Sequence, residues 1–289
     1  MADACNGVDT GFVALGYAKV ALLGVVQGIT ELMPISSSAH MRIVPAVLGW
    51  QDPGAAFSAA MQLAALFAVV SYFWSDVAGL AGGSLSAVAK GRFSDPKFRL
   101  SLWIVLATIP LVAAGVALAP ILNACNSPLR SIPAIGVACL VMAALLALAE
   151  VGARHSRTVT KAGLIDALLV GLAQVGSLIP GVSRSGSTLT AALALGFKRE
   201  EAARFSFLLG IPAIAGAGLK ELWELHKVHL GSHGWSVLGV GIAVGAVSAF
   251  VTIWALMRIL ERVSAWPFVA YRALLGVALL AGAASGWLH

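Results

Sequence analysis

Long runs of apolar residues recur along most of the 289-residue chain, separated by short polar segments. A helix needs about 20 consecutive apolar residues to cross the hydrocarbon core of a bilayer. Runs of this length predict a polytopic α-helical membrane protein. The expected spanning helices are 55–74, 99–122, 133–151, 203–222, 234–257 and 264–288.

Two polar stretches interrupt this pattern and resemble each other. The first reads VQGITELMPISSS (26–38), and the second reads AQVGSLIPGVSRSGST (173–188). Each contains a proline, which removes a backbone hydrogen bond, and serines, which compete for others, so neither suits the middle of a spanning helix. Non-helical backbone at membrane depth must be buried in protein or line a wet cavity. The stretches therefore predict two re-entrant helix pairs whose tips meet near the midplane of the membrane.

The two stretches also define an internal repeat. Each is preceded by an apolar run and followed by three of the expected spans. Because three is an odd number, the second half lies upside down relative to the first, as in inverted-topology repeats. We expect one membrane domain, 1–289, with repeat halves at approximately 13–151 and 163–288. The 31 glycines are typical of closely packed membrane helices.

Composition and charge agree with this architecture. Hydrophobic residues make up 59% of the chain and charged residues 11%, against about 25% charged in soluble domains. The net charge of +6 does not indicate nucleic-acid binding, because the basic residues lie in short loops. With the N-terminus outside, twelve Lys and Arg residues face the cytoplasm and five face outward, which obeys the positive-inside rule. The outward five are Lys19, Arg42, Arg130, Lys220 and Lys227.

The second stretch has the chemistry of a phosphate clamp. Helix N-termini present free N–H groups and a positive dipole end, so two facing tips would form a cradle for an anion. Arg184 carries the planar fork that suits bidentate phosphate recognition. Gly181 and Gly186 would let the backbone approach a ligand closely. Further hydroxyl donors are Ser183, Ser185, Ser187 and Thr188.

The first stretch supplies reactive groups. Ser36, Ser37 and Ser38 are candidate nucleophiles, and His40 can act as base, acid or nucleophile near neutral pH. Ser37 and His40 are three residues apart and would share one helix face. We assign catalysis to Ser37, His40, Glu31 and Arg184, and phosphate binding to Ser36 and Ser38. The residues alone do not decide whether Ser37 or His40 attacks phosphorus.

A possible metal site lies just before these serines. Glu31 is a carboxylate at membrane depth, which is costly unless it is paired or bound to metal. Gln27 is four residues earlier and shares its helix face. Carboxylate, amide and phosphate oxygens suit the hard cations Mg²⁺ and Ca²⁺.

Plainer structural roles compete with these assignments. A serine-rich tip after a proline can simply cap a helix. Arg184 can be a structural counter-ion for Glu31. We expect the remaining charged groups at span ends, Asp166, Glu150 and Arg272, to be packing or interface partners.

At these two stretches the sequence resembles the undecaprenyl-diphosphate phosphatase family, also called bacitracin-resistance proteins. One family signature, (E/Q)xxxE followed by PxSS and His, is present as QGITE (27–31), PISS (34–37) and His40. The other, PGxSRSGxT, is present as PGVSRSGST (180–188). Further similar segments are 61–70, 205–217 and 267–272.

The resemblance implies a membrane enzyme that removes the terminal phosphate of undecaprenyl diphosphate, recycles the lipid carrier for cell-wall synthesis and confers bacitracin resistance. It also implies a bacterial cytoplasmic membrane location, a site open to the outer face, a divalent-metal requirement and a homodimer. Some members carry Glu where this chain has Gln27, which puts two-carboxylate metal binding in doubt. Positions that match the family's essential and supporting residues are Glu31, Ser37, His40, Arg184, Ser183 and Thr188.

A secondary transporter or lipid flippase is the alternative, because inverted repeats with broken helices are typical of transporters. A transporter needs a binding cradle but no nucleophile and base. The Ser37–His40 pair beside Arg184 therefore favours the phosphatase. A channel is a weaker alternative, because no ring of like residues is repeated.

Overall fold

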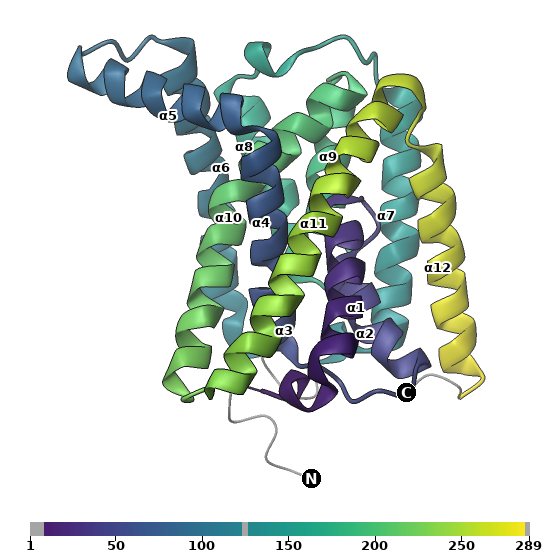
Figure 1. Cartoon of the computed structure of the whole chain (residues 1–289). Coiled ribbons are helices and arrows are strands. Elements are labelled where there is room, and N and C mark those ends of the chain that lie inside the picture. The colour runs from purple at the N-terminus through teal and green to yellow at the C-terminus, as the bar shows by residue number, and fades with distance from the viewer. Residues whose placement is uncertain (1–8, 123–126, 287–289) are drawn as a thin grey trace.

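The computed structural model describes residues 9–122 and 127–286, and within these ranges the chain is helical with one isolated β-bridge. The helices form a bundle from which α5 projects at one end (Figure 1). They are α1 Phe12–Leu32, α2 Ser37–Val47, α3 Ala55–Ala60, α4 Gln62–Tyr72, α5 Trp74–Ala89, α6 Pro96–Leu122, η1 Pro128–Arg130, α7 Ile132–Gly152, η2 Val159–Lys161, α8 Leu164–Val175, η3 Gly176–Leu178, α9 Arg184–Ala194, α10 Arg199–Lys227, α11 Ser232–Arg262 and α12 Trp266–Ala284.

Six helices in the described ranges are long and apolar enough to cross a membrane, namely α1, α6, α7, α10, α11 and α12. Five of the expected spans coincide with α6, α7, α10, α11 and α12, and positions 287–288 of the last lie outside the described residues. The expected span 55–74 corresponds to α3 and α4, which are continuous through the helical backbone of Met61, and an 80° bend at its end leads into α5. The length of α1 also differs from the expectation of a short re-entrant arm.

α1 is bent near its start and packs tightly against α11. Gly16, at φ 72° and ψ 176°, interrupts the helical backbone, so the regular part of α1 begins after it. A Cβ at Gly24 would lie 2.6 Å from the Gly241 carbonyl oxygen, and one at Gly28 would lie 2.5 Å from that of Gly245. Only glycine permits this approach of two helix backbones. The contact fixes the end of α1 that carries Gln27 and Glu31.

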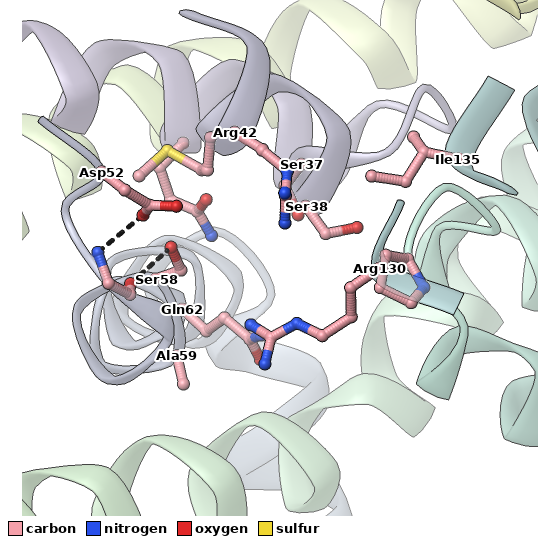
Figure 2. A pocket seen from close by; sticks show the side chains of 13 residues that line it. Ser37, Ser38, Arg42, Asp52, Ser58, Ala59, Gln62, Arg130 and Ile135 are labelled. Carbon is pink, nitrogen blue, oxygen red and sulfur yellow. Dashed lines mark hydrogen bonds between the residues drawn. The ribbon is translucent and has the colours of Figure 1, made fainter. Parts of the chain in front are cut away.

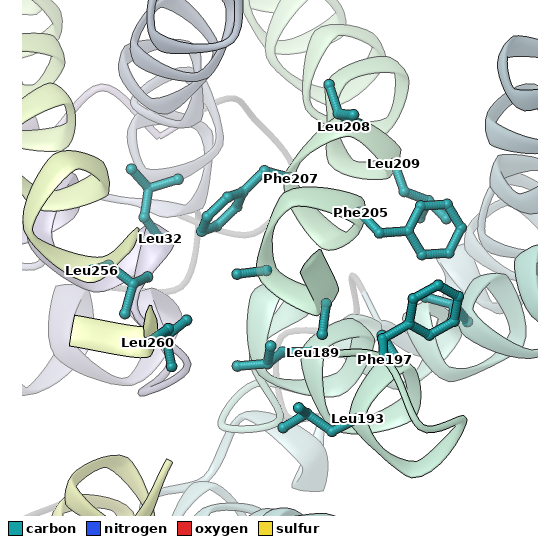
Figure 3. Packing of buried hydrophobic residues seen from close by; sticks show 14 of the residues in the cluster. Leu32, Leu189, Leu193, Phe197, Phe205, Phe207, Leu208, Leu209, Leu256 and Leu260 are labelled. Atoms are coloured by element: carbon teal, nitrogen blue, oxygen red, sulfur yellow. The ribbon is translucent and has the colours of Figure 1, made fainter. Parts of the chain in front are cut away.

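The largest hydrophobic cluster links the two halves of the chain. Leu32 at the end of α1 lies near Leu256 and Leu260 of α11 and Phe207 of α10 (Figure 3). Phe197 and Phe205 stack with ring centroids 5.9 Å apart. Burial of large side chains from both halves supports the bends between α1 and α2 and between α8 and α9.

The two bends are in direct contact, and one buried arginine joins them. The Ser38 hydroxyl accepts a hydrogen bond from the Gly181 amide at 3.3 Å. Arg272 of α12, only 1% exposed, donates to the carbonyl oxygens of Pro34, Gly181 and Val182 at 2.8–3.0 Å. The prediction that Arg272 is a packing partner is confirmed.

The other two charged groups expected to pack at span ends also have partners. Asp166 binds Arg157 through both carboxylate oxygens, at 2.6 and 2.8 Å. One carboxylate oxygen of Glu150 accepts from Arg199. Both acids are structural ion-pair partners at the same end of the bundle, as the sequence predicted.

Candidate active site

The two bends share one backbone conformation. Ser36 (φ 76°) is the N-cap of α2 and Ser183 (φ 71°) is the N-cap of α9. Each side chain accepts a hydrogen bond from the amide three residues later, at 3.4 Å from Ala39 and 3.1 Å from Gly186. The capping role that competed with a phosphate-binding role is therefore present at both bends.

Glu31 is the centre of a buried polar cluster between the bends. One of its oxygens, Oε2, accepts from the Ser37 hydroxyl at 2.6 Å and from the Gln27 amide at 3.0 Å. The other, Oε1, forms an ion pair with Arg184 at 2.8 Å. The structure thus brings together four residues predicted from two distant segments. It also confirms the counter-ion role of Arg184.

His40 lies on α2 but does not contact Ser37 through either ring nitrogen. Its Nδ1 lies 2.7 Å from the Ser36 carbonyl oxygen, and its Nε2 lies 2.6 Å from the Tyr271 hydroxyl. Because a carbonyl can only accept, Nδ1 carries a proton in this arrangement. The tyrosine ring also stacks on the imidazole, with centroids 5.7 Å apart. The expected pairing of His40 with Ser37 is absent, because the Ser37 hydroxyl is directed to Glu31 instead.

A polar pocket of about 200 Å³ opens beside this cluster (Figure 2). Ser37, Ser38 and Gln27 line it, whereas Glu31, His40 and Arg184 lie outside its wall. Ser37 and Gln27 therefore join the buried cluster to the open space. The complete wall is Gln27, Ser37, Ser38, Met41, Arg42, Asp52, Gly54, Ser58, Ala59, Gln62, Arg130, Ile135 and Pro180.

The hydroxyls of the second bend are engaged within the protein. Ser185 donates to the carbonyl oxygens of Glu31 and Met33, at 3.0 and 3.1 Å. Thr188 bonds the Ser206 hydroxyl and the Arg184 carbonyl oxygen. These bonds hold α9 against α1 and α10. Phosphate binding remains a prediction for Ser183, Ser185 and Thr188, and it would require them to exchange these partners.

The two glycines of the second bend permit close protein packing. Gly181 has φ 96°, and a Cβ there would lie 2.7 Å from the Ile135 carbonyl oxygen. A Cβ at Gly186 would lie 3.0 Å from an Arg272 guanidinium nitrogen. Contacts with α7 and α12 therefore account for both glycines. A ligand approaching them remains a prediction.

Six polar residues at the site were not predicted from the sequence, namely Tyr271, Arg42, Arg130, Asp52, Ser58 and Gln62. Tyr271 contacts His40 from a helix 231 residues later, and no local pattern signals this contact. Arg42 is four residues after Ser38, so their shared helix face was a usable signal. Arg130 lies in η1, just before α7, and reaches the pocket only through the tertiary fold.

The donor set suits a hard cation only in part. The described residues contain no group of three or more His, Cys, Asp and Glu side chains placed to hold a metal. Gln27, Glu31 and Ser37 nevertheless place oxygen-bearing groups within hydrogen-bond distance of one another. Mg²⁺ typically uses one or two carboxylates together with substrate phosphates. The residues fit a cation that takes its remaining ligands from a phosphate.

Comparison with known proteins gives consistent matches over nearly the whole chain. The family model described as Bacitracin resistance protein BacA matches residues 20–278. Undecaprenyl-diphosphatase 2 of Mesorhizobium japonicum is 74% identical over 91% of this chain and 99% of its own length. The undecaprenyl-diphosphatase of Gloeobacter violaceus is 48% identical over 95% of this chain and 94% of its own. That of Trichormus variabilis is 43% identical over 98% and 89%.

Proposed function

The chain belongs to the bacitracin resistance protein family, and on this premise we propose that it is a membrane phosphatase acting on undecaprenyl diphosphate. The products are undecaprenyl phosphate and inorganic phosphate. In the cell this reaction would recycle the lipid carrier of cell-wall synthesis and confer bacitracin resistance. The names of the relatives favour a hydrolase over a transporter or flippase.

One observation supports the chemistry most directly. The Ser37 hydroxyl lines the polar pocket and donates at 2.6 Å to the buried carboxylate of Glu31. A hydroxyl held by an adjacent proton acceptor is the usual arrangement of an activated nucleophile. Ser37 is also the first residue of α2, where free N–H groups and the helix dipole stabilise developing negative charge.

The proposed reaction has two steps. Ser37 Oγ attacks the terminal phosphorus, its proton passes to Glu31, and the bond from that phosphorus to the bridging oxygen breaks. Undecaprenyl phosphate leaves with the bridging oxygen, and a phosphoserine remains. Water then attacks the phosphoserine, Glu31 returns the proton of the first step to Ser37 Oγ as that P–O bond breaks, and both water protons leave with inorganic phosphate.

Arg184 and His40 position Glu31 and Ser37. Arg184 holds Glu31 through Oε1, and its remaining N–H groups can turn to the transferring phosphate. His40 fixes the Ser36 carbonyl, and through it the start of α2. A bound Mg²⁺ or Ca²⁺ would neutralise phosphate charge. Glu31 and the amide oxygen of Gln27 would hold it.

The proposed topology is an inverted repeat with two re-entrant helix pairs. The regular part of α1, 17–32, is about 24 Å long and α8 about 18 Å, at 1.5 Å per residue. Both are shorter than the hydrocarbon core of about 30 Å. The site would then open to the outer face of the bacterial cytoplasmic membrane, in a homodimer.

Cysteine labelling in a background without native cysteines tests this topology. Positions 94 and 156 should react only from the cytoplasm, and positions 127 and 232 only from outside. Labelling of position 127 from the cytoplasm would overturn the re-entrant arrangement, because 13–48 would then cross the membrane an odd number of times.

The proposed activity is tested by phosphate release from C55 and C15 prenyl diphosphates by the purified protein, with and without EDTA. We expect release that EDTA suppresses and that Ser37→Ala abolishes. A folded wild-type protein that releases no phosphate in either buffer would contradict the assignment. Ser84→Ala, a change in the projecting α5, is the matched control.

A further inference from the structure

The polar pocket contains two arginines that the proposed reaction at Ser37 does not use. Arg42 and Arg130 both line the pocket and are partly buried. Within residues 9–122 and 127–286, neither forms an ion pair with a carboxylate. A partly buried cation without an acidic partner is costly, so its placement requires a compensating group.

The other arginines that are not exposed show the contrast. Those that pair with carboxylates are Arg157, Arg184, Arg199 and Arg204. Arg272 is surrounded by three carbonyl acceptors. Arg42 and Arg130 have no comparable partner, although both face the same small polar space. An anion that enters the pocket would be their shared partner.

The positions of the two side chains indicate what kind of anion fits. Arg42 lies one helical turn after Ser38 on α2, and in Figure 2 it ends beside Ser37 and Ser38. Arg130 enters from the opposite wall and crosses the pocket toward Gln62 (Figure 2). A single phosphate at Ser37 would leave part of this charged surface unoccupied. Two adjacent phosphates would fill it.

The charge of the wall agrees with an anion of more than one charge. Asp52 is the acidic residue among the described wall residues, and its Oδ1 is occupied by the Gly54 amide at 2.8 Å. Two guanidinium groups against one carboxylate leave a net positive wall. Guanidinium groups bind phosphate oxygens through paired N–H donors.

We propose that Arg42 and Arg130 bind the phosphate that remains on the lipid, while the terminal phosphate lies at Ser37. This inference rests on the proposed function. It assigns to the two arginines the selection of diphosphates over monophosphates, because a monophosphate at Ser37 leaves them without a partner. A diphosphate therefore gains bonds from both arginines that a monophosphate does not make.

The first test measures kinetics with farnesyl diphosphate in Arg42→Gln, Arg130→Gln and the double variant. The retained phosphate is the leaving group and gains negative charge as the bridging bond breaks, so kcat/KM should fall by at least about tenfold for each arginine. Arg42→Lys should recover part of the loss. Arg92→Gln, which changes an exposed loop arginine, should leave kcat/KM unchanged. Unaltered kcat/KM in the double variant would overturn the proposal.

The second test measures binding without turnover, so it stands apart from the proposed activity. Methylenediphosphonate, whose P–C–P bridge resists hydrolysis, and orthophosphate are titrated by calorimetry in neutral detergent free of anionic lipid. The double variant should lose at least about tenfold in methylenediphosphonate affinity and much less in orthophosphate affinity. An equal loss for both ligands would place the arginines at the terminal phosphate and overturn the inference. Selective loss in a protein without phosphatase activity would uphold the diphosphate site and reject the proposed function.

Discussion

The two bends have the same backbone but carry different chemistry. In both, a serine with positive φ caps the new helix, and its hydroxyl also bonds the serine two residues later. The residue directly after each cap is Ser37 in the first bend and Arg184 in the second. Both side chains reach Glu31, one at each carboxylate oxygen. A repeated turn thus delivers two different groups to one acid.

The glutamines that precede the bends show what the second half lacks. Gln27 and Gln174 each lie nine residues before the capping serine. Gln27 bonds Glu31, whereas both polar side-chain atoms of Gln174 are buried without a partner. The position equivalent to Glu31 is Leu178, which offers no acceptor. The second bend therefore keeps the scaffold of the first without its acid.

Substitution of Ser37 should have the largest effect on activity, because Ser37 is the proposed nucleophile and Arg184, its equivalent in the second bend, is not. Ser37→Ala should lower kcat by at least about 1,000-fold. Acid quench of the wild type with ³²P-labelled substrate should yield an acid-stable, base-labile phosphoprotein. An acid-labile, base-stable adduct would instead make His40 the nucleophile.

The equivalent residue of the second bend should have the next largest effect. Arg184→Lys keeps the charge but loses the planar fork, so kcat/KM should fall about 100-fold while the protein stays folded. Arg157→Lys, which alters a partly buried ion pair outside the pocket wall, is the control and should stay near wild type. Retention of more than about half of the activity would show that Arg184 does not bind the reacting phosphate through its fork.

A substitution at Gly210, a neighbour of Arg184, should shift the Arg184 guanidinium and have a smaller effect than replacing Arg184 itself. A Cβ at Gly210 of α10 would meet the Arg184 guanidinium. Gly210→Ala should displace that guanidinium and lower kcat/KM about tenfold. A Cβ at Gly216, on the same helix, meets no atom within 4 Å, so Gly216→Ala is the matched control. Equal activity of the two variants would indicate that the position of Arg184 is not critical.

Variants of Gln27 and Gln174 test whether only the first bend supplies a metal ligand, and the readout is the metal dependence of the reaction. Gln27→Glu should retain activity and lower the Mg²⁺ concentration for half-maximal rate, because carboxylate number tunes affinity for hard cations. Gln174→Glu should not produce this shift, since no acid or phosphate lies beside it. The measurement is a Mg²⁺ titration of both variants, and identical curves would remove Gln27 from the coordination sphere.

The smallest change in activity is expected at Gln174 itself. Gln174→Met removes two unpartnered polar atoms from a buried site, so it should raise the free energy of unfolding by about 1 kcal/mol or more. Activity should stay within about twofold of wild type. Thermal unfolding in detergent measures the first expectation and phosphate release the second. A destabilised variant would mean that Gln174 has an acceptor in the membrane-embedded protein.

Local signals predicted most of the fold and the contents of the site. Apolar run length identified five of the spanning helices, because each long helix must satisfy its own backbone in lipid. The capping serines and the Glu31–Arg184 pair also followed from residue type. The 80° bend between Tyr72 and Trp74 did not, since neither proline nor glycine marks it.

The partners of the reactive groups could not be predicted locally. Helical spacing placed Ser37 and His40 on one face, but Ser37 turns back toward Glu31 across the bend. His40 is directed away by Tyr271, a residue from α12. Arg130 reaches the pocket through the packing of η1 against it. Such contacts depend on tertiary geometry, which sequence spacing does not encode.

Arg272 has a consequence for motion between the halves. Transporters with inverted repeats work by tilting one half against the other around a central site. Here one buried guanidinium binds carbonyls from both bends, Pro34 on one side and Gly181 and Val182 on the other. Separating the two bends would break the bond of that cation to Pro34, at a cost of about 1.5–3 kcal/mol. The contact between the bends is therefore braced against the rocking that alternating access needs.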